Sequence, residues 1–345
     1  MTRVFDIDKT RTQCDRRIVF TDLLSHCVLL YFALYENRRL FLDQQLVVNS
    51  GFHHNRSIAY CIRKERHVVE VLRRYRLLIA GAILVVLITL FGLVGQLFVP
   101  EDMAEVGAGR PAKPPSAEHW LGTDQQGRDI LADLIYGTPT SLEIGVIAGI
   151  LGVTLGALMG LIAGYTGGLV DEVIRIVVDI LLTIPSLMIL IIVASMLGAV
   201  SVEAMALIIA ALSWMWPART IRAQVLTIRE RMYVQLARFN GASNLKIIIG
   251  ELLPNLAPYL AANLVGAISG AVLASVGLST LGLGPMTRPS LGLTFYWAIT
   301  YGALIRQMWW WFLPPIVIIV VLFLGLFLMS QGLDQIANPR LQSKA

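Results

Sequence analysis

Few residues of this 345-residue chain have the type and spacing that metal binding requires. Its three cysteines, Cys14, Cys27 and Cys61, all come early in the chain. His53 and His54 lie between the second and the third of them. Cysteine and histidine are the usual zinc ligands, but this spacing matches no common zinc pattern. We therefore expect surface residues here and no metal site.

Residues 107–113 have a superficial likeness to a phosphate-binding loop. They lack the Gly-Lys-Ser/Thr ending that contacts phosphate and magnesium, and they do not lie between a strand and a helix. The sequence pattern pairs no nucleophile with a base. We therefore expect no catalytic residue, no ATPase site and no cofactor bound by this chain.

The most informative segment is a polar, basic insert at residues 219–255, between two apolar stretches. Its first half favours a helix that ends at Gly241, because glycine supplies the left-handed or tightly packed backbone at which one helix turns into another. A second, amphipathic half runs to Leu253, and Pro254 is expected to stop it. Such an ordered elbow outside the lipid indicates a docking surface. Four arginines flank the elbow and can meet acidic residues of a partner: Arg222, Arg229, Arg231 and Arg238.

Membrane-spanning helices are the elements that hold this insert. The chain is 56% hydrophobic and 15% charged, far from a soluble average. A helix needs about 20 apolar residues to cross the hydrocarbon. We therefore predict an all-α membrane protein with six transmembrane helices, near residues 77–99, 141–165, 174–197, 202–216, 258–278 and 312–329. Five glycines of the second helix share one face, and we expect that face to pack closely against other helices: Gly145, Gly149, Gly152, Gly156 and Gly160.

The distribution of charge predicts the orientation of these helices. Of the 28 Lys and Arg residues, 14 precede the first span and six lie between Arg219 and Lys246. Residues 100–140 hold three, against seven acidic residues. By the positive-inside rule, both termini and the 219–255 loop are cytoplasmic, and the 100–140 loop faces outward. The cysteines then lie on the reducing side, so we expect no structural disulfide.

Residues 1–70 form a basic extension to which we assign no function. Its apolar part, residues 20–35, is short for a span and carries polar groups such as Asp22. It lacks the small-residue cleavage site of a signal peptide. We favour an interfacial or soluble amphipathic helix over a seventh crossing, with a start codon assigned too far upstream as the alternative.

The outward loop contains a polar string at residues 119–131. Its two glycines permit tight turns, its threonine or the next aspartate can cap a following helix, and its arginine can pair with the adjacent aspartate. Residue types alone favour an exposed turn before a capped interfacial helix. The candidate residues of this string are Gly122, Thr123, Asp124, Gly127, Arg128 and Asp129.

These features resemble ABC importer permeases of the dipeptide/oligopeptide family, specifically the C-type subunit. The outer string is similar to the family signature His-Pro-Leu-Gly-Thr-Asp-x-x-Gly-Arg-Asp, with Trp120 at the proline position. The 219–255 loop is similar to its Glu-Ala-Ala, three residues, Gly and then Leu-Pro-Asn. Further matches follow in family order, so the resemblance covers roughly residues 71–342. It implies a first helix with an outer loop over residues 71–140 and a permease domain over residues 141–342.

The resemblance identifies the 219–255 loop as the coupling loop that contacts an ATPase. The family's glutamate is Gln235 here, which removes a charge-assisted contact of about 1.5–3 kcal/mol while an amide can still hydrogen-bond. The candidate coupling residues are Gln235, Leu236, Ala237, Gly241, Leu253, Pro254 and Asn255.

The resemblance also implies a function and a set of partners. The chain would have the type I ABC importer permease fold, lie in the cell membrane and move di- or oligopeptides by alternating access; nickel chelates and glutathione are alternative cargoes. Its partners would be a homologous permease subunit, two ABC ATPases that bind ATP and magnesium, an extracytoplasmic substrate-binding protein and membrane lipid, with no nucleic acid.

Two functions of other classes stay open. A secondary transporter needs charges on an ion path, whereas Asp171, Glu172, Arg175 and Asp179 lie near a predicted cytoplasmic boundary. A membrane anchor that only recruits ATPases would not need the outer string.

Overall fold

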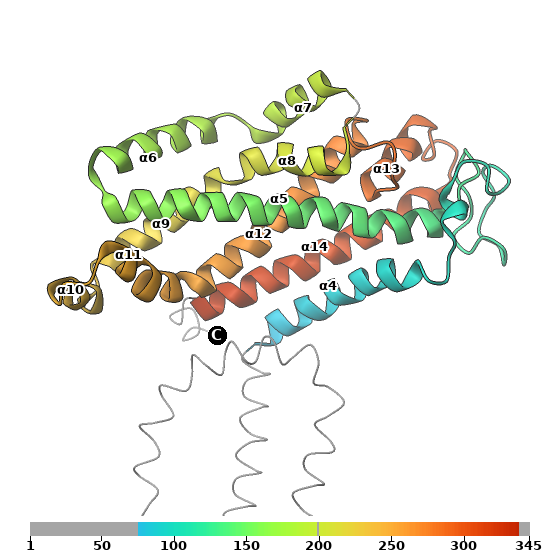
Figure 1. Ribbon diagram of the computed structural model, residues 1–345. Helices are drawn as coiled ribbons and strands as arrows, with labels where there is room; N and C mark the ends of the chain where they lie inside the picture. The colour runs from blue at the N-terminus through green and yellow to red at the C-terminus, as the bar shows by residue number, and fades with distance from the viewer. Residues whose placement is uncertain (1–74, 199, 338–345) are drawn as a thin grey trace, which may run out of the picture. The chain divides into compact units, whose positions relative to one another are not determined.

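A computed structural model describes residues 75–198 and 200–337. The predictions for residues 1–70 lie outside these ranges. The described residues form helices and loops without a β-strand, which confirms the all-α prediction. Figure 1 shows the long helices running along one another as a bundle.

Within the described residues, five helical runs are long and apolar enough to cross a membrane. They are α4 (Arg76–Gly95), α5 (Ile130–Thr166), α8 with α9 (Val202–Ser213 and Met215–Arg229), α11 through α12 (Asn244–Ile247 to Leu253–Thr280), and α14 (Trp309–Ala337). α6 (Gly168–Thr183) and α7 (Ser186–Leu197) qualify only together, and counted as one broken span they correspond to the third predicted span, residues 174–197. The remaining short helices are η2 (Glu101–Ala104), α10 (Met232–Phe239), η3 (Ile248–Leu252) and α13 (Leu291–Thr300).

The third span is broken at Pro185. α6 and α7 are bent by 78° relative to each other. Ile184 leaves the helical region, with φ −89° and ψ 128°, because the ring of a following proline disfavours helical backbone. Pro185 then precedes the first turn of α7. A single apolar stretch in the sequence therefore becomes two helices of different direction.

α5 is the central packing element, and its glycine face is the reason. A β-carbon at Gly149 would lie 2.6 Å from Ile268 Cγ1 of α12. A β-carbon at Gly156 would lie 2.6 Å from the carbonyl oxygen of Trp214, between α8 and α9. Both distances are too short for a side chain, so these helices approach as closely as glycine allows. The predicted packing role of the stripe is confirmed.

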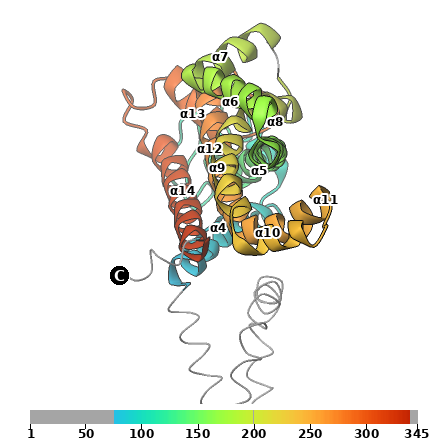
Figure 2. The same cartoon turned by 90° about the vertical axis from the view of Figure 1, so that its left-hand side faces the viewer.

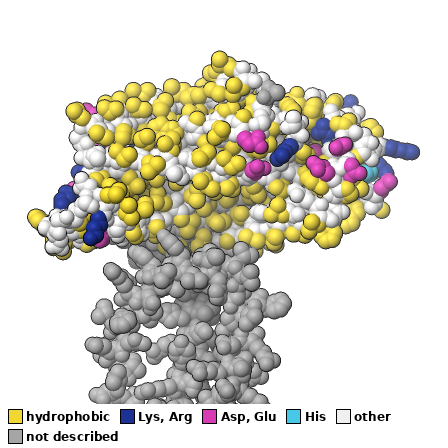
Figure 3. All heavy atoms as spheres, viewed as in Figure 1, with side chains coloured by type: hydrophobic (Ala, Val, Ile, Leu, Met, Phe, Trp, Pro, Cys, Tyr) yellow, Lys and Arg dark blue, Asp and Glu magenta, His cyan; other side chains and the backbone are white. Residues whose placement is uncertain are grey.

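The two loops singled out in the sequence lie at opposite ends of the bundle. Figure 1 shows the loop before α5 at one end and α10 with α11 at the other, together with the start of α4 and the end of α14. Figure 2 views the bundle from this second end, with α9 and α12 between α5 and α14. On the face seen in Figure 3, hydrophobic side chains dominate the surface between the ends. Six crossings predict that the start of α4, the end of α14 and the loop at residues 219–255 lie at one end of the bundle, with the loop at residues 100–140 at the other.

Candidate functional site

The loop between α9 and α12 contains a short helix that ends as predicted. Gly241 follows α10 and has a φ of 76°. The Gly241 N–H donates to the Arg238 carbonyl at 3.0 Å, and the Ala242 N–H donates to the Ala237 carbonyl at 3.1 Å. This pair of bonds is a Schellman motif, which requires a left-handed residue. A β-carbon at Gly241 would meet nothing within 4 Å, so the glycine serves the turn and not close packing.

α10 has one buried anchor and an exposed apolar face. Val234 is fully buried in a cluster with Ile221 and Val225 of α9 and Leu256 of α12. The opposite face carries three large side chains that are exposed by 71%, 54% and 85%: Met232, Leu236 and Phe239. Their spacing of four and three residues places them on one side of the helix. α10 is therefore attached to the spanning helices and presents an apolar surface outward.

The other predicted residues of this loop divide between α10 and α12. The Gln235 side-chain amide donates to the Glu230 carbonyl at 3.3 Å. Ala237 packs on the buried cluster that contains Val234 and Leu252. Three more residues are exposed where α12 begins: Leu253, Pro254 and Asn255.

The prediction that Pro254 stops the helix was wrong. The π-helical turn η3 leads directly into α12, and Asn244–Thr280 runs as one span. Pro254 lies in the first turn of α12, where a missing N–H removes little hydrogen bonding. The Leu253 N–H donates to the Ile248 carbonyl, five residues back, in the wider π pattern.

The arginines near α10 differ from the prediction, since two of the four bind within the bundle. Arg222 forms a two-bond ion pair with Asp171 of α6, with Nη2 to Oδ2 at 2.6 Å. Arg229 Nη1 donates to the Gly164 carbonyl of α5 at 2.9 Å. Arg231 and Arg238 are exposed. The Arg238 guanidinium also lies 5.7 Å from the centre of the Tyr165 ring on α5, a cation–π distance. The Arg222 pair holds α6 on α9, close to the attachment of α10.

At the opposite end, Asp129 is the N-cap of α5. Its Oδ1 accepts from the N–H groups of Leu131 at 2.8 Å and Ala132 at 3.1 Å. Its Oδ2 lies 2.7 Å from Nδ1 of the buried His119. The predicted Arg128–Asp129 pair was wrong, because the Asp129 carboxylate already contacts His119. The predicted caps at Thr123 or Asp124 were also wrong, because Asp129 itself is the cap.

Thr123 and Asp124 instead hold the outer string together. The Thr123 hydroxyl donates to the Arg110 carbonyl at 2.6 Å and accepts from the Lys113 N–H at 2.9 Å. Asp124 Oδ1 accepts from the N–H groups of Gln126 and Arg128 at 2.7 and 2.9 Å. Burial raises the pKa of the Asp124 carboxyl, and the backbone N–H groups oppose that shift. Most of the string is therefore buried or partly buried, and Trp120 is the exposed exception at 74%.

The two glycines and Arg128 complete the contacts that hold the outer string in place. Gly122 and Gly127 have φ of 75° and 79°, which confirms the predicted tight turns. The Arg128 guanidinium lies 5.6 Å from the centre of the Trp297 ring on α13, a cation–π distance. The Gln126 amide donates to the Tyr301 hydroxyl at 3.0 Å. The sequence did not predict that His119, the first residue of the string, pairs with Asp129. It also did not predict Trp297 and Tyr301, which come from a distant part of the chain.

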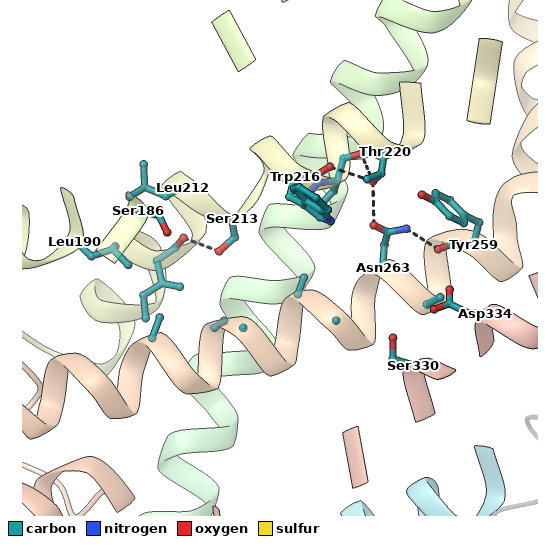
Figure 4. A pocket seen from close by; sticks show the side chains of 18 residues that line it. Ser186, Leu190, Leu212, Ser213, Trp216, Thr220, Tyr259, Asn263, Ser330 and Asp334 are labelled. Carbon is teal, nitrogen blue, oxygen red and sulfur yellow. Dashed lines mark hydrogen bonds between the residues drawn. The ribbon is translucent and has the colours of Figure 1, made fainter. Parts of the chain in front are cut away.

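A cavity of about 560 Å³ lies among α7, α8, α9, α12 and α14 (Figure 4). Small residues of α12, including Gly266, Ala267 and Gly270, form part of its wall. Thr220, Asn263 and Asp334 give it a polar end. The sequence predicted none of these as site residues, because they come from three helices that are distant in the chain.

Comparison with known proteins assigns the family. Residues 152–343 match the family described as binding-protein-dependent transport system inner membrane component. A putative peptide transport system permease protein of Brucella abortus biovar 1 is 32% identical over 274 residues, which cover 79% of this chain and 90% of that protein. The dipeptide transport system permease protein DppC of Alkalihalophilus pseudofirmus is 31% identical over 220 residues, covering 64% and 72%.

The match with another relative covers a shorter part of the chain. The oligopeptide transport system permease protein OppC of Mycobacterium tuberculosis is 32% identical over 173 residues, which cover 50% of this chain. The chain spans 60% of the length of that relative. The spanning helices agree with the family description of an inner membrane component. The chain belongs to the family of inner membrane components of binding-protein-dependent transport systems.

Proposed function

We propose that this chain is the permease subunit of an ATP-driven importer of di- or oligopeptides. The family match and the printed names of the peptide permeases support the cargo class. The partners in this proposal are a homologous permease subunit, two ABC ATPases that carry ATP and magnesium, and an extracytoplasmic binding protein. Both termini and α10 lie on the cytoplasmic side, in line with the positive-inside rule.

The observation that carries the proposal is the construction of α10. An exposed apolar face in a soluble loop is costly unless another protein covers it. Met232, Leu236 and Phe239 form such a face, while Val234 ties the same helix to α9 and α12. A push on the face is therefore passed through buried contacts to two helices that also line the cavity.

The mechanism follows from this connection. Closure of the ATPases on ATP moves α10, and α9 and α12 move with it because their contacts with Val234 are close-packed. The cavity then changes its access from one side of the membrane to the other. ATP hydrolysis in the partner subunits resets the cycle, and this chain supplies no catalytic group to that step.

The test is uptake by purified, reconstituted transporter. The complex of this chain with its partner permease, ATPases and binding protein is expected to accumulate radiolabelled Ala-Ala only when the ATPases can hydrolyse ATP. Uptake by this chain without ATPases, driven by an ion gradient, would support a secondary transporter instead. ATPase recruitment without uptake of Ala-Ala, of a nickel chelate or of glutathione would support a membrane anchor.

A further inference from the structure

The polar end of the cavity contains a carboxylate that pairs with no cation among residues 75–198 and 200–337. Asp334 and Ser330 are one helical turn apart on α14, and both line the cavity (Figure 4). In the described part of the chain, no ion pair or hydrogen bond involves the carboxylate of Asp334, and this residue is partly buried. Ionisable groups within apolar helices are costly and usually functional. This carboxylate therefore has capacity to bind a cation.

Neighbouring polar groups in the cavity face the same end. The Thr220 hydroxyl of α9 lies 3.2 Å from Oδ1 of Asn263 on α12. The Asn263 side-chain amide also donates to the Tyr259 carbonyl at 3.0 Å, so its position is fixed. Figure 4 shows Thr220, Asn263 and Asp334 at the same end of the cavity. Their oxygen atoms are the type of acceptor that an ammonium group uses.

The wall beside this end leaves room for a small molecule. A β-carbon at Gly266 or Gly270 of α12 would meet no atom within 4 Å. The volume of about 560 Å³ falls in the usual range of ligand pockets. The remaining lining is mostly small and apolar, which suits peptide side chains without selecting among them.

We propose that Asp334, with Ser330 and Asn263, forms a subsite for the α-ammonium group of a peptide in transit. The inference rests on the proposed function, because a peptide importer supplies this ligand. The carboxylate forms a charge-assisted contact with the ammonium group, and the amide and hydroxyl oxygens accept its other protons. The subsite recognises the one cationic feature common to free peptides, so it is compatible with any side-chain sequence.

The experiment measures occupancy of the cavity directly. Ala267, which lines the cavity one helical turn from Asn263, is changed to cysteine in a chain whose Cys14, Cys27 and Cys61 are serine. The assembled transporter is treated with a methanethiosulfonate reagent, without binding protein, and protection by Ala-Ala is compared with protection by N-acetyl-Ala-Ala. We expect Ala-Ala to protect, and the acetylated peptide to need about a tenfold higher concentration.

Three variants separate recognition from structure. D334N is expected to raise the half-protecting concentration of Ala-Ala about tenfold and to leave that of the acetylated peptide unchanged. D334E is expected to restore protection, and E172Q, on the exposed side of α6, is the matched control.

The outcomes distinguish this subsite from the proposed function. Equal protection by both peptides, no protection by either, or no effect of D334N would overturn the subsite even if ATP-dependent uptake persists. Protection of the expected pattern without any ATP-dependent uptake would preserve the subsite and refute the importer.

Discussion

Replacement of Gly241 by valine tests the role of α10 without disturbing the rest of the fold. The residue has φ 76°, a region that costs residues with a β-carbon roughly 1–2 kcal/mol and β-branched residues more. No atom lies within 4 Å of the added β-carbon, so no clash disturbs the spanning helices. The perturbation is therefore confined to the backbone turn after α10.

The size of the effect follows from the bonds that this turn makes. Escape from the left-handed region breaks the Gly241–Arg238 and Ala242–Ala237 hydrogen bonds, each worth about 0.5–1.5 kcal/mol. The valine variant therefore either keeps the turn at a strain cost of roughly 1–2 kcal/mol or loses both bonds at a cost of about 1–3 kcal/mol. A helix of eight residues has little stability of its own and depends on these bonds and on Val234. We expect α10 to lose its fixed orientation.

The assay compares G241V with G241N, because asparagine tolerates left-handed backbone. G241V is expected to accumulate in the membrane at a normal level, to retain less ATPase on purification and to lose at least roughly tenfold in uptake, in line with the estimated cost. G241N is expected to keep most of its uptake. If G241V carries peptide and ATPase as well as the parent chain does, α10 has no part in coupling.

Three further predictions follow from the same contacts. G266L should accumulate normally yet block uptake. G156L should fail to accumulate, because its β-carbon would lie 2.6 Å from the Trp214 carbonyl oxygen. Immunoblots of membranes measure the abundance of both variants, and equal abundance would contradict the packing described. D129A removes the cap of α5 and the His119 contact and should cost about 2–4 kcal/mol, seen as a lower melting temperature by fluorescence-detected gel filtration; an unchanged melting temperature would rule out that role. F239A should leave melting unchanged, since the ring is 85% exposed, and reduce the ATPase retained on purification, while full retention would show that the partner binds elsewhere.

Most of the predictions that the structure confirmed came from hydropathy and from the positions of glycines. The apolar stretches located five spans, and a sixth if α6 and α7 count as one, because length and composition alone decide whether a helix can cross a bilayer. Gly241 was predictable because a left-handed residue after a helix is nearly always glycine or asparagine. The glycine face of α5 was predictable because small residues at helical spacing permit close approach.

The missed features depend on contacts and on a helix register that arise only when the chain folds. Asp129 caps α5 rather than pairing with Arg128, because the fold brings His119 to its other oxygen. Pro254 continues a helix because the register of η3 places it in a first turn. Asp334 and Asn263 share a cavity only once α12 and α14 have packed together.

The most direct test of coupling is the reactivity of a cavity thiol in two nucleotide states. With cysteine at Ala267 as the reporter, modification is measured in the complete transporter before and after trapping with ATP and orthovanadate. The account predicts that trapping changes the modification rate in the parent chain and that this change disappears in G241V. The same change in both chains, or no change in either, would contradict transmission of work through α10.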